Sequence, residues 1–121
     1  MPRKAAATAA NKIKTVNVEE GVSITPMPVT LGEPVQITYE GLLAKNGARQ
    51  VYTHLGYGGN DSWSDIQDIP MSAADKRWYC ALTPDVSSTT RMNFCFHDGA
   101  NHWDNNNGHN WSLAIHNGQL E

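Results

Sequence analysis

The chain has 121 residues, of which 40% are hydrophobic and 17% charged, and its formal net charge is −3. This length leaves room for one ordinary domain, and the composition excludes a disordered acidic chain. No run of 18 or more apolar residues is present, so the sequence predicts no transmembrane helix and no membrane partner.

Charge is distributed unevenly along the chain. Residues 1–18 contain Arg3, Lys4, Lys12 and Lys14 and no acidic residue, whereas the rest has five basic residues against twelve acidic ones, a net charge of −7. A folded part with this charge repels phosphate backbones, so we expect no nucleic-acid partner. We interpret residues 1–20 as a flexible basic leader and residues 21–121 as the folded domain.

The leader does not have the pattern of a secretion signal. Its one apolar run, AAATAA, is too short and too weakly apolar for the central part of such a signal. We therefore expect a cytoplasmic protein, or an extracellular one if the sequence is a processed fragment.

In the first half of the chain, apolar residues alternate with period two between turn residues, which is typical of short strands. Val22–Thr25 is predicted as the first strand and Pro34–Glu40 as the second. Asn46-Gly47 is a turn signal, and Val51–Tyr57 is the strand that follows it. Very little of the sequence is typical of a helix.

The second half continues the same pattern. The residues Gly58-Gly59-Asn60-Asp61 open a loop that carries Trp63, and a long polar loop is expected at Asp98–Asn110. Further strands are predicted at Ile66–Met71 (a short edge strand, because Pro70 lacks a donor), Lys76–Thr83, Arg91–His97 and Trp111–Ile115. Six or seven short strands with regular turns predict an all-β fold, an antiparallel immunoglobulin-like β-sandwich.

The two cysteines, Cys80 and Cys95, lie in separate predicted strands. Alternation points Met92, Phe94 and Phe96 to one side of their strand and Cys95 to the other. If the first side is the core, Cys95 faces outward and a bridge across the core is geometrically awkward. We therefore expect two free thiols.

The four tryptophans have different settings. Trp78 and Trp111 stand in alternating apolar runs, where packing against the sheet is the expected role. Trp63 and Trp103 are surrounded by polar loop residues, so each either packs down onto the core or contacts a ligand.

A sugar is the ligand that suits such a loop tryptophan. The axial C–H groups of a pyranose form an apolar face, which matches the flat apolar area and the negative quadrupole of an indole. The segment DGANHWDNNNG provides an indole together with Asn, Asp and His groups that can bind hydroxyls at the ring edge. One stacked ring that buries about 100 Å² gains about 2.5 kcal/mol.

Three segments together resemble a known family. In chain order, VYTHLGYGG, DSW and NFCFHDGANHWDNNNGHNWSL are similar to the starch-binding carbohydrate-binding modules of family 25 and the related family 53. The most specific part is Phe96-His97-Asp98-Gly99 followed by Trp103-Asp104-Asn105-Asn106, and the resemblance covers roughly residues 22–116. His97 stands where the family often has Asn.

The resemblance implies non-catalytic binding of α-1,4-linked glucans such as starch, glycogen and malto-oligosaccharides on an open surface. The matching ligand platform is His54, Trp63 and Trp103, and we expect the two indoles to face solvent and to be coplanar enough to cradle a curved polysaccharide. Tyr57 and Asn101 are secondary candidates. Asn105 and Asn106 are candidates for hydroxyl contacts too, although Asx residues here more readily build a turn.

Such modules usually accompany an amylase domain, so a separate glucan-active enzyme is a further expected partner. No cofactor is expected.

A metal site would be a different use of the same loop. Asp98, Asp104, Asn105 and Asn107 could form a calcium-assisted, lectin-like site, but no Glu follows Gly108 at the spacing of a calcium loop. The spacings of His97, His102 and His109 match no standard zinc motif. We therefore predict no metal ligand.

Catalysis and protein recognition are two further functions that a small β-domain can have. A glycosidase needs two carboxyl groups across a cleft, one with a raised pKa, and the polar loop around Asp98 and Asp104 offers nothing to raise either. We expect no enzyme. An immunoglobulin-like interaction domain that presents its aromatic residues to a protein remains compatible with the sequence.

Overall fold

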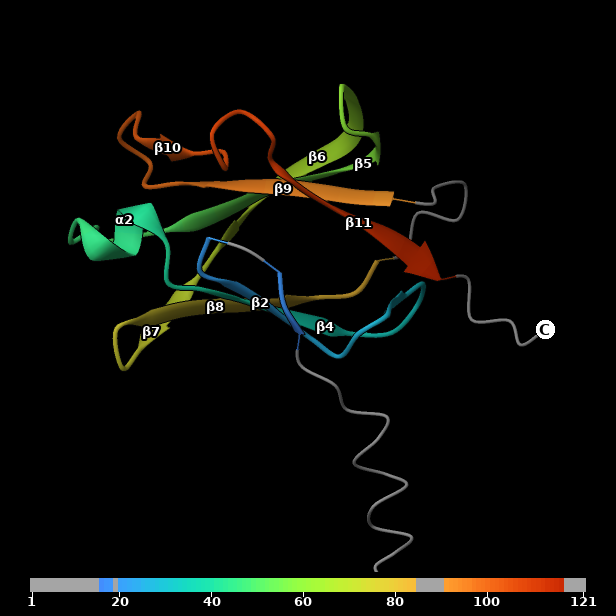
Figure 1. Ribbon diagram of the computed structural model, residues 1–121, viewed down its shortest axis with the longest axis horizontal. Coiled ribbons are helices and arrows are strands. Elements are labelled where there is room, and N and C mark those ends of the chain that lie inside the picture. Colours follow the sequence, from blue (N-terminus) through green and yellow to red (C-terminus); the bar gives the residue numbers. More distant parts are fainter. Residues whose placement is uncertain (1–15, 19, 85–90, 117–121) are drawn as a thin grey trace, which may run out of the picture.

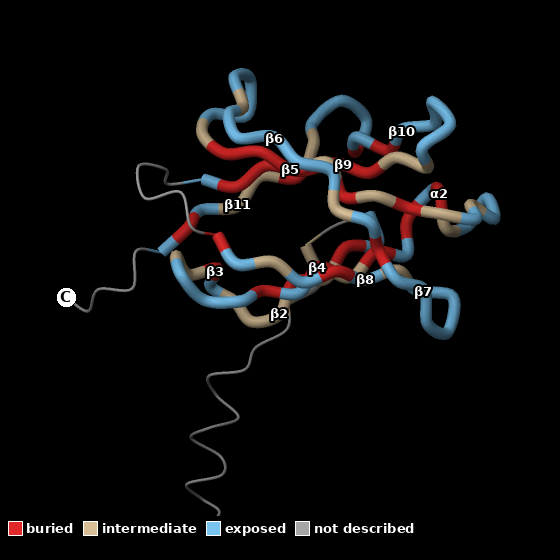
Figure 2. Tube along the Cα trace, turned by 180° about the vertical axis from the view of Figure 1, so that it is seen from behind, coloured by how far each residue is buried: buried red, intermediate tan, exposed pale blue. Residues whose placement is uncertain are grey.

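In the computed structural model, two β-sheets face one another and enclose the core between them (Figure 1). The structure describes residues 16–18, 20–84 and 91–116. In Figure 2 the buried segments lie in strands of both sheets, whereas most of the loops are exposed. The predicted β-sandwich is confirmed.

The first sheet has five strands in the order β1-β2-β4-β8-β7. All of its neighbouring strands are antiparallel. Its strands are β1 (Val16–Asn17), β2 (Val22–Thr25), β4 (Val35–Tyr39), β8 (Arg77–Leu82) and β7 (Ser72–Ala74).

The second sheet has the order β3-β11-β9-β5-β6, and a short strand, β10, pairs with β9 beside this path. The pair of β3 with β11 is parallel. The prediction that the sandwich is antiparallel throughout is therefore wrong for this pair. Its strands are β3 (Val29–Thr30), β11 (Trp111–His116), β9 (Arg91–His97), β5 (Tyr52–Gly59), β6 (Ser62–Pro70) and β10 (Trp103–Asp104).

Several element boundaries differ from the prediction. Strand β1 lies inside the predicted leader and pairs with β2, so the sandwich begins before residue 21; residues 1–15 lie outside the described part. A short helix, α2 (Leu42–Lys45), precedes the Asn46-Gly47 turn and was not predicted. Strand β6 is longer than the expected edge strand and includes Trp63.

The core follows the predicted alternation. Met92, Phe94 and Phe96 on β9 are fully buried, and Trp111 on β11 is 3% exposed. The Trp111 ring is stacked on Phe94 at 6.1 Å between centroids and contacts the Phe96 ring at 5.2 Å. Trp78 is partly buried and packs against the core, as expected for a strand residue.

Both cysteines are free and buried. Cys95 lies on the opposite side of β9 from the Met and Phe residues, beside His54 in the register with β5, yet it is only 6% exposed. The outward-facing position predicted for it is therefore covered. Burial raises the pKa of the Cys95 thiol to about 12, with a further contribution from the carboxylates of Asp68 and Asp104.

Within the described residues, the structure contains no helix with the length and apolarity needed to span a membrane.

Candidate functional site

The outer face of β5 forms the centre of the site. Thr53 and Leu55 point into the core and are fully buried, so alternation turns Tyr52, His54 and Gly56 outward. The His54 side chain is 25% exposed. His54 thus lies on the outer face of the sheet, where a residue of the ligand platform has to be.

A bulge in β6 brings Trp63 over this face. The register between β5 and β6 shifts between Leu55 and Tyr57, and Asp65 in the extra segment has a φ of 52°. Trp63 lies in β6, opposite Gly58, rather than in the predicted loop. Its indole N–H donates a hydrogen bond to the Asn60 carbonyl oxygen at 2.9 Å.

Gly56 provides the surface on which the Trp63 side chain lies. A Cβ atom at this position would be only 2.9 Å from the Cβ of Trp63 and 3.0 Å from its Cε3. Any larger residue would therefore push the indole away from β5. The half-buried Trp63 ring reaches the His54 ring at 5.8 Å between centroids.

Trp103 also lies in a strand, since β10 pairs it with His97 on β9. Its side chain is 48% exposed, which makes it one of the few large exposed hydrophobic residues in the described ranges. The Trp103 ring packs on His97 at 4.5 Å and on His54 at 5.2 Å. His97 in turn is stacked on Tyr52 at 5.0 Å. We call these five rings the aromatic platform: Tyr52, His54, Trp63, His97 and Trp103.

The two indoles of the platform are inclined to one another. The His54 ring makes an angle of 34° with Trp63 and of 89° with Trp103. The planes of the two indoles are therefore inclined to one another by at least the difference of these angles, 55°. The platform is a bent surface with His54 at the bend.

Asp68 holds the two imidazoles of the platform. Its Oδ1 atom lies 2.7 Å from Nδ1 of His54 and 2.8 Å from Nε2 of His97. The Gly99 N–H donates to Nδ1 of His97 at 3.1 Å. Because Nδ1 accepts this bond, the proton of His97 is on Nε2, which donates to Asp68. His54 likewise donates from Nδ1, which leaves its Nε2 for a ligand.

The ionised form of Asp68 is favoured by these bonds. Partial desolvation raises the pKa of this carboxyl group, but the hydrogen bonds from His54 and His97 lower it by more. The resulting pKa is below the usual value. Asp68 therefore remains a hydrogen-bond acceptor that orients both rings at neutral pH.

These same three residues are also the group that a metal ion could use, because their ligand atoms lie within 4.8 Å of one another. A metal bound by Nε2 of His97 would require the proton on Nδ1, since a metal-bound imidazole donates from its other nitrogen. The group beside Nδ1 of His97 is the Gly99 N–H, which is a donor and cannot accept a hydrogen bond from a protonated Nδ1. The hydrogen bonds thus disfavour a metal at His54, Asp68 and His97.

The oxygen ligands considered for a calcium site are used within the loop. Asp98 accepts bonds from the backbone N–H groups of Ala100 and His102, and Asn105 accepts one from Gly108. The Ala100 bond is the largest cause that lowers the pKa of Asp98, which is the opposite of what a catalytic acid needs. These groups build the loop.

The secondary contacts predicted from the sequence have mixed outcomes. Tyr57 is 2% exposed and belongs to the core, and Asn106 is 6% exposed, so the prediction is wrong for both. Tyr57 is three residues from His54 in the same strand, so it points to the opposite face. Asn101 and Asn105 are exposed, and Asn105 uses its side-chain oxygen to form the turn, as expected.

The sequence interpretation missed Tyr52, Asp68 and His97. Tyr52 shares the outer face of β5 with His54, so the alternation already contained a signal for it. His97 ends β9 beside the Asp98-Gly99 turn. Asp68 is opposite His54 only because of the register of β6, which the sequence does not reveal.

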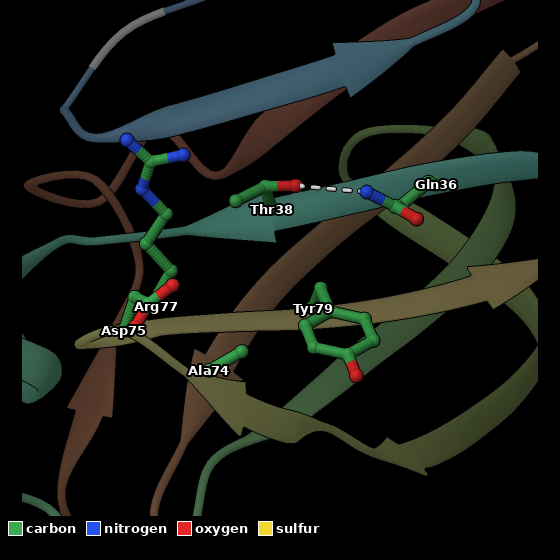
Figure 3. A pocket seen from close by; sticks show the side chains of 6 residues that line it. All are labelled: Gln36, Thr38, Ala74, Asp75, Arg77 and Tyr79. Carbon is green, nitrogen blue, oxygen red and sulfur yellow. Dashed lines mark hydrogen bonds between the residues drawn. The ribbon is translucent and has the colours of Figure 1, made fainter.

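A hollow lies on the outer face of the first sheet, away from the platform (Figure 3). It has a volume of about 360 Å³, and the 39% exposed ring of Tyr79 on β8 is its aromatic residue. Gln36 and Thr38 on β4 are joined there by a hydrogen bond of 3.4 Å. Among the described residues that line this hollow, Tyr79 is the one aromatic residue, in contrast to the five packed rings of the platform.

The chain is similar to known carbohydrate-binding modules in sequence and in fold. Residues 35–94 match the sequence model described as starch/carbohydrate-binding module (family 53). Among solved structures, the fold is similar to that of an iodinated family 25 module from a Bacillus halodurans amylase. The TM-score is 0.50 at 15% identity, over 71% of this chain and 87% of that one.

Curated relatives include amylases from three bacteria. An alpha-amylase of Clostridium acetobutylicum is 34% identical over 78% of this chain and 12% of its own length. A beta/alpha-amylase of Paenibacillus polymyxa is 32% identical over 69% of this chain and 6% of its own length. A beta-amylase of Niallia circulans is 31% identical over 58% of this chain and 12% of its own length. The chain therefore corresponds to a small part of each relative.

Proposed function

We propose that this chain, whose residues 35–94 match the model of family 53 of the starch/carbohydrate-binding modules, binds α-1,4-linked glucans on its aromatic platform without cleaving them. The observation that carries the proposal is the presence of Trp63 and Trp103 on one outer face, with His54 between them. Starch, glycogen and malto-oligosaccharides are the ligands that we infer.

The apolar faces of two sugar rings suit the two indoles. Each ring that buries about 100 Å² on an indole gains about 2.5 kcal/mol. Two such contacts, reduced by the cost of association, correspond to dissociation constants in the roughly micromolar-to-millimolar range. An α-1,4-linked chain is curved, and the inclination of at least 55° between the indoles suits rings that are turned relative to one another.

The polar part of recognition rests on His54. When the Nδ1–H group of a neutral His54 donates its hydrogen bond to Asp68, the Nε2 atom has a lone pair that can accept a hydrogen bond from a sugar hydroxyl. Asp68 contributes by fixing this orientation. The exposed Asn101 and Asn105 remain secondary candidates at the edge of the platform.

We also infer that the sandwich has immunoglobulin-like connectivity. If β2, β4, β5, β7, β8, β9 and β11 are taken as strands A to G, the first sheet contains the order A-B-E-D and the second contains G-F-C. This is the division of strands in that fold.

The amylase relatives support a further part of the proposal. The chain matches a small share of each of them, so its working context includes a glucan-active enzyme, which would be held near its polymer by this module. The module itself then contributes attachment rather than chemistry.

Migration in a native gel that contains soluble starch or glycogen tests the function. We expect retardation relative to a gel without polysaccharide, with bovine serum albumin as the reference protein, and the same retardation in the presence of a chelator. Unchanged migration would refute glucan binding. Loss of retardation with chelator would favour a calcium-assisted site, and release of reducing sugar would contradict the non-catalytic assignment.

Replacement of Gly56 by Ala should weaken glucan binding by roughly tenfold, because the new Cβ displaces the Trp63 indole and part of its stacking is lost. A titration with maltotriose, followed by tryptophan fluorescence, measures the effect. Gly59→Ala is the matched control on the same strand, since its Cβ would meet only the flexible end of Asp61 at 3.2 Å. Equal affinities of the two variants would contradict this role of Gly56.

A further inference from the structure

A groove adjoins the platform at Trp103 and is lined in part by the β9–β10 loop. Residues 42–50, from α2 and the turn after it, form one wall, and residues 98–103 form the other. The groove has a volume of about 750 Å³, within the range of small-molecule sites. Trp103 belongs both to this groove and to the platform. Figure 1 shows α2 and β10 at the same end of the sandwich.

A buried carboxylate joins the two walls. Asp104, which follows Trp103 and is 8% exposed, accepts hydrogen bonds from the Tyr39 hydroxyl and from the Leu42 N–H. The Tyr39 hydroxyl also accepts a bond from the Leu43 N–H at 2.9 Å. These bonds attach the start of α2 to the strand that carries Trp103. The groove is therefore preformed, which lowers the entropic cost of filling it.

The surface of the groove combines apolar and polar groups. Leu42 is 54% exposed and Trp103 is 48% exposed, and such residues gathered in a hollow indicate a binding surface. Arg49, Asn101 and His102 add hydrogen-bonding groups around them. The side-chain oxygens of Asp98 are already bonded to Ala100 and His102, so the wall offers no free acidic group from that residue.

From this arrangement we propose that the groove is a second glucan subsite, in which sugar units beyond those on the platform lie against Leu42 and Trp103. The inference rests on the proposed function. A glucan is favoured over a protein segment because Trp103 makes the groove continuous with the platform. Apolar area beside hydrogen-bonding groups also suits sugar rings.

Titrations with malto-oligosaccharides from maltose to maltoheptaose, followed by calorimetry, test the subsite. We expect the affinity of the unmodified protein to rise with chain length after the platform is filled. Leu42→Ala should lower the affinity for maltoheptaose about five- to tenfold, because the groove loses apolar contact. The affinity for maltotriose, which fills only the platform, should stay within about twofold of that of the unmodified protein. Ala100→Phe, which fills the groove from the other wall, should have the same effect.

Tyr79→Ala is the matched control, since it removes an exposed ring on the opposite sheet and should leave every affinity unchanged. If short oligomers bind but the gain with length is absent, or persists in Leu42→Ala and Ala100→Phe, the groove is not a subsite and the platform proposal stands. If no oligomer binds the unmodified protein, the platform proposal itself fails and the subsite fails with it.

Discussion

Trp103→Ala is expected to lower the affinity for α-glucans by about 70-fold while the protein keeps its fold. The factor corresponds to the loss of one stacked sugar ring, about 2.5 kcal/mol. Stability should change little, because the Trp103 side chain is 48% exposed and makes its ring contacts with the surface residues His54 and His97. Fluorescence titration with maltoheptaose and a thermal melt measure the two effects.

The same titration on Tyr79→Ala separates the platform from exposed aromatic residues in general. Tyr79 is 39% exposed on the other sheet, so its loss should leave the affinity within about twofold. An affinity loss in Tyr79→Ala as large as that in Trp103→Ala would contradict the proposal that the platform alone binds the glucan, because Tyr79 lies on the other sheet. Unfolding of Trp103→Ala would show that this indole belongs to the core.

Trp111→Ala should behave in the opposite way and destabilise the domain by about 3–5 kcal/mol. Its indole is 3% exposed and packs against the rings of Phe94 and Phe96, so the truncation leaves a cavity inside the sandwich. Urea denaturation, followed by circular dichroism, gives the free energy of unfolding.

Trp111→Phe is the companion variant, because it keeps most of the aromatic volume and should recover much of the stability. A loss of less than about 1 kcal/mol in Trp111→Ala would contradict the core position. So would a selective loss of glucan affinity in a fully stable protein.

Strand alternation carried most of the fold prediction. Strands β2 and β9 have the predicted bounds, and His54 faces outward opposite the buried Thr53 and Leu55 because side chains alternate along any strand. The short strands β1, β3 and β10 could not be predicted. Two residues carry too little pattern, and their pairing depends on partners far along the chain.

The site was only partly predictable for a related reason. The choice of His54, Trp63 and Trp103 came from a resemblance to a family, and the structure brings these three rings together. The place of Asp68 depends on a bulge in β6, which is a matter of register and not of composition. Tyr57 was proposed although alternation puts it on the inner face, so the local pattern was the better guide there.

The bend between the two indoles has a consequence for selectivity. In a flat, ribbon-like polymer such as cellulose, neighbouring sugars present nearly parallel faces. Such a ribbon cannot lie against both Trp63 and Trp103 while their planes differ by at least 55°. For the proposed glucan platform, discrimination between glucose polymers would then come from the shape of the backbone, since the monomer and its hydroxyl groups are the same in both.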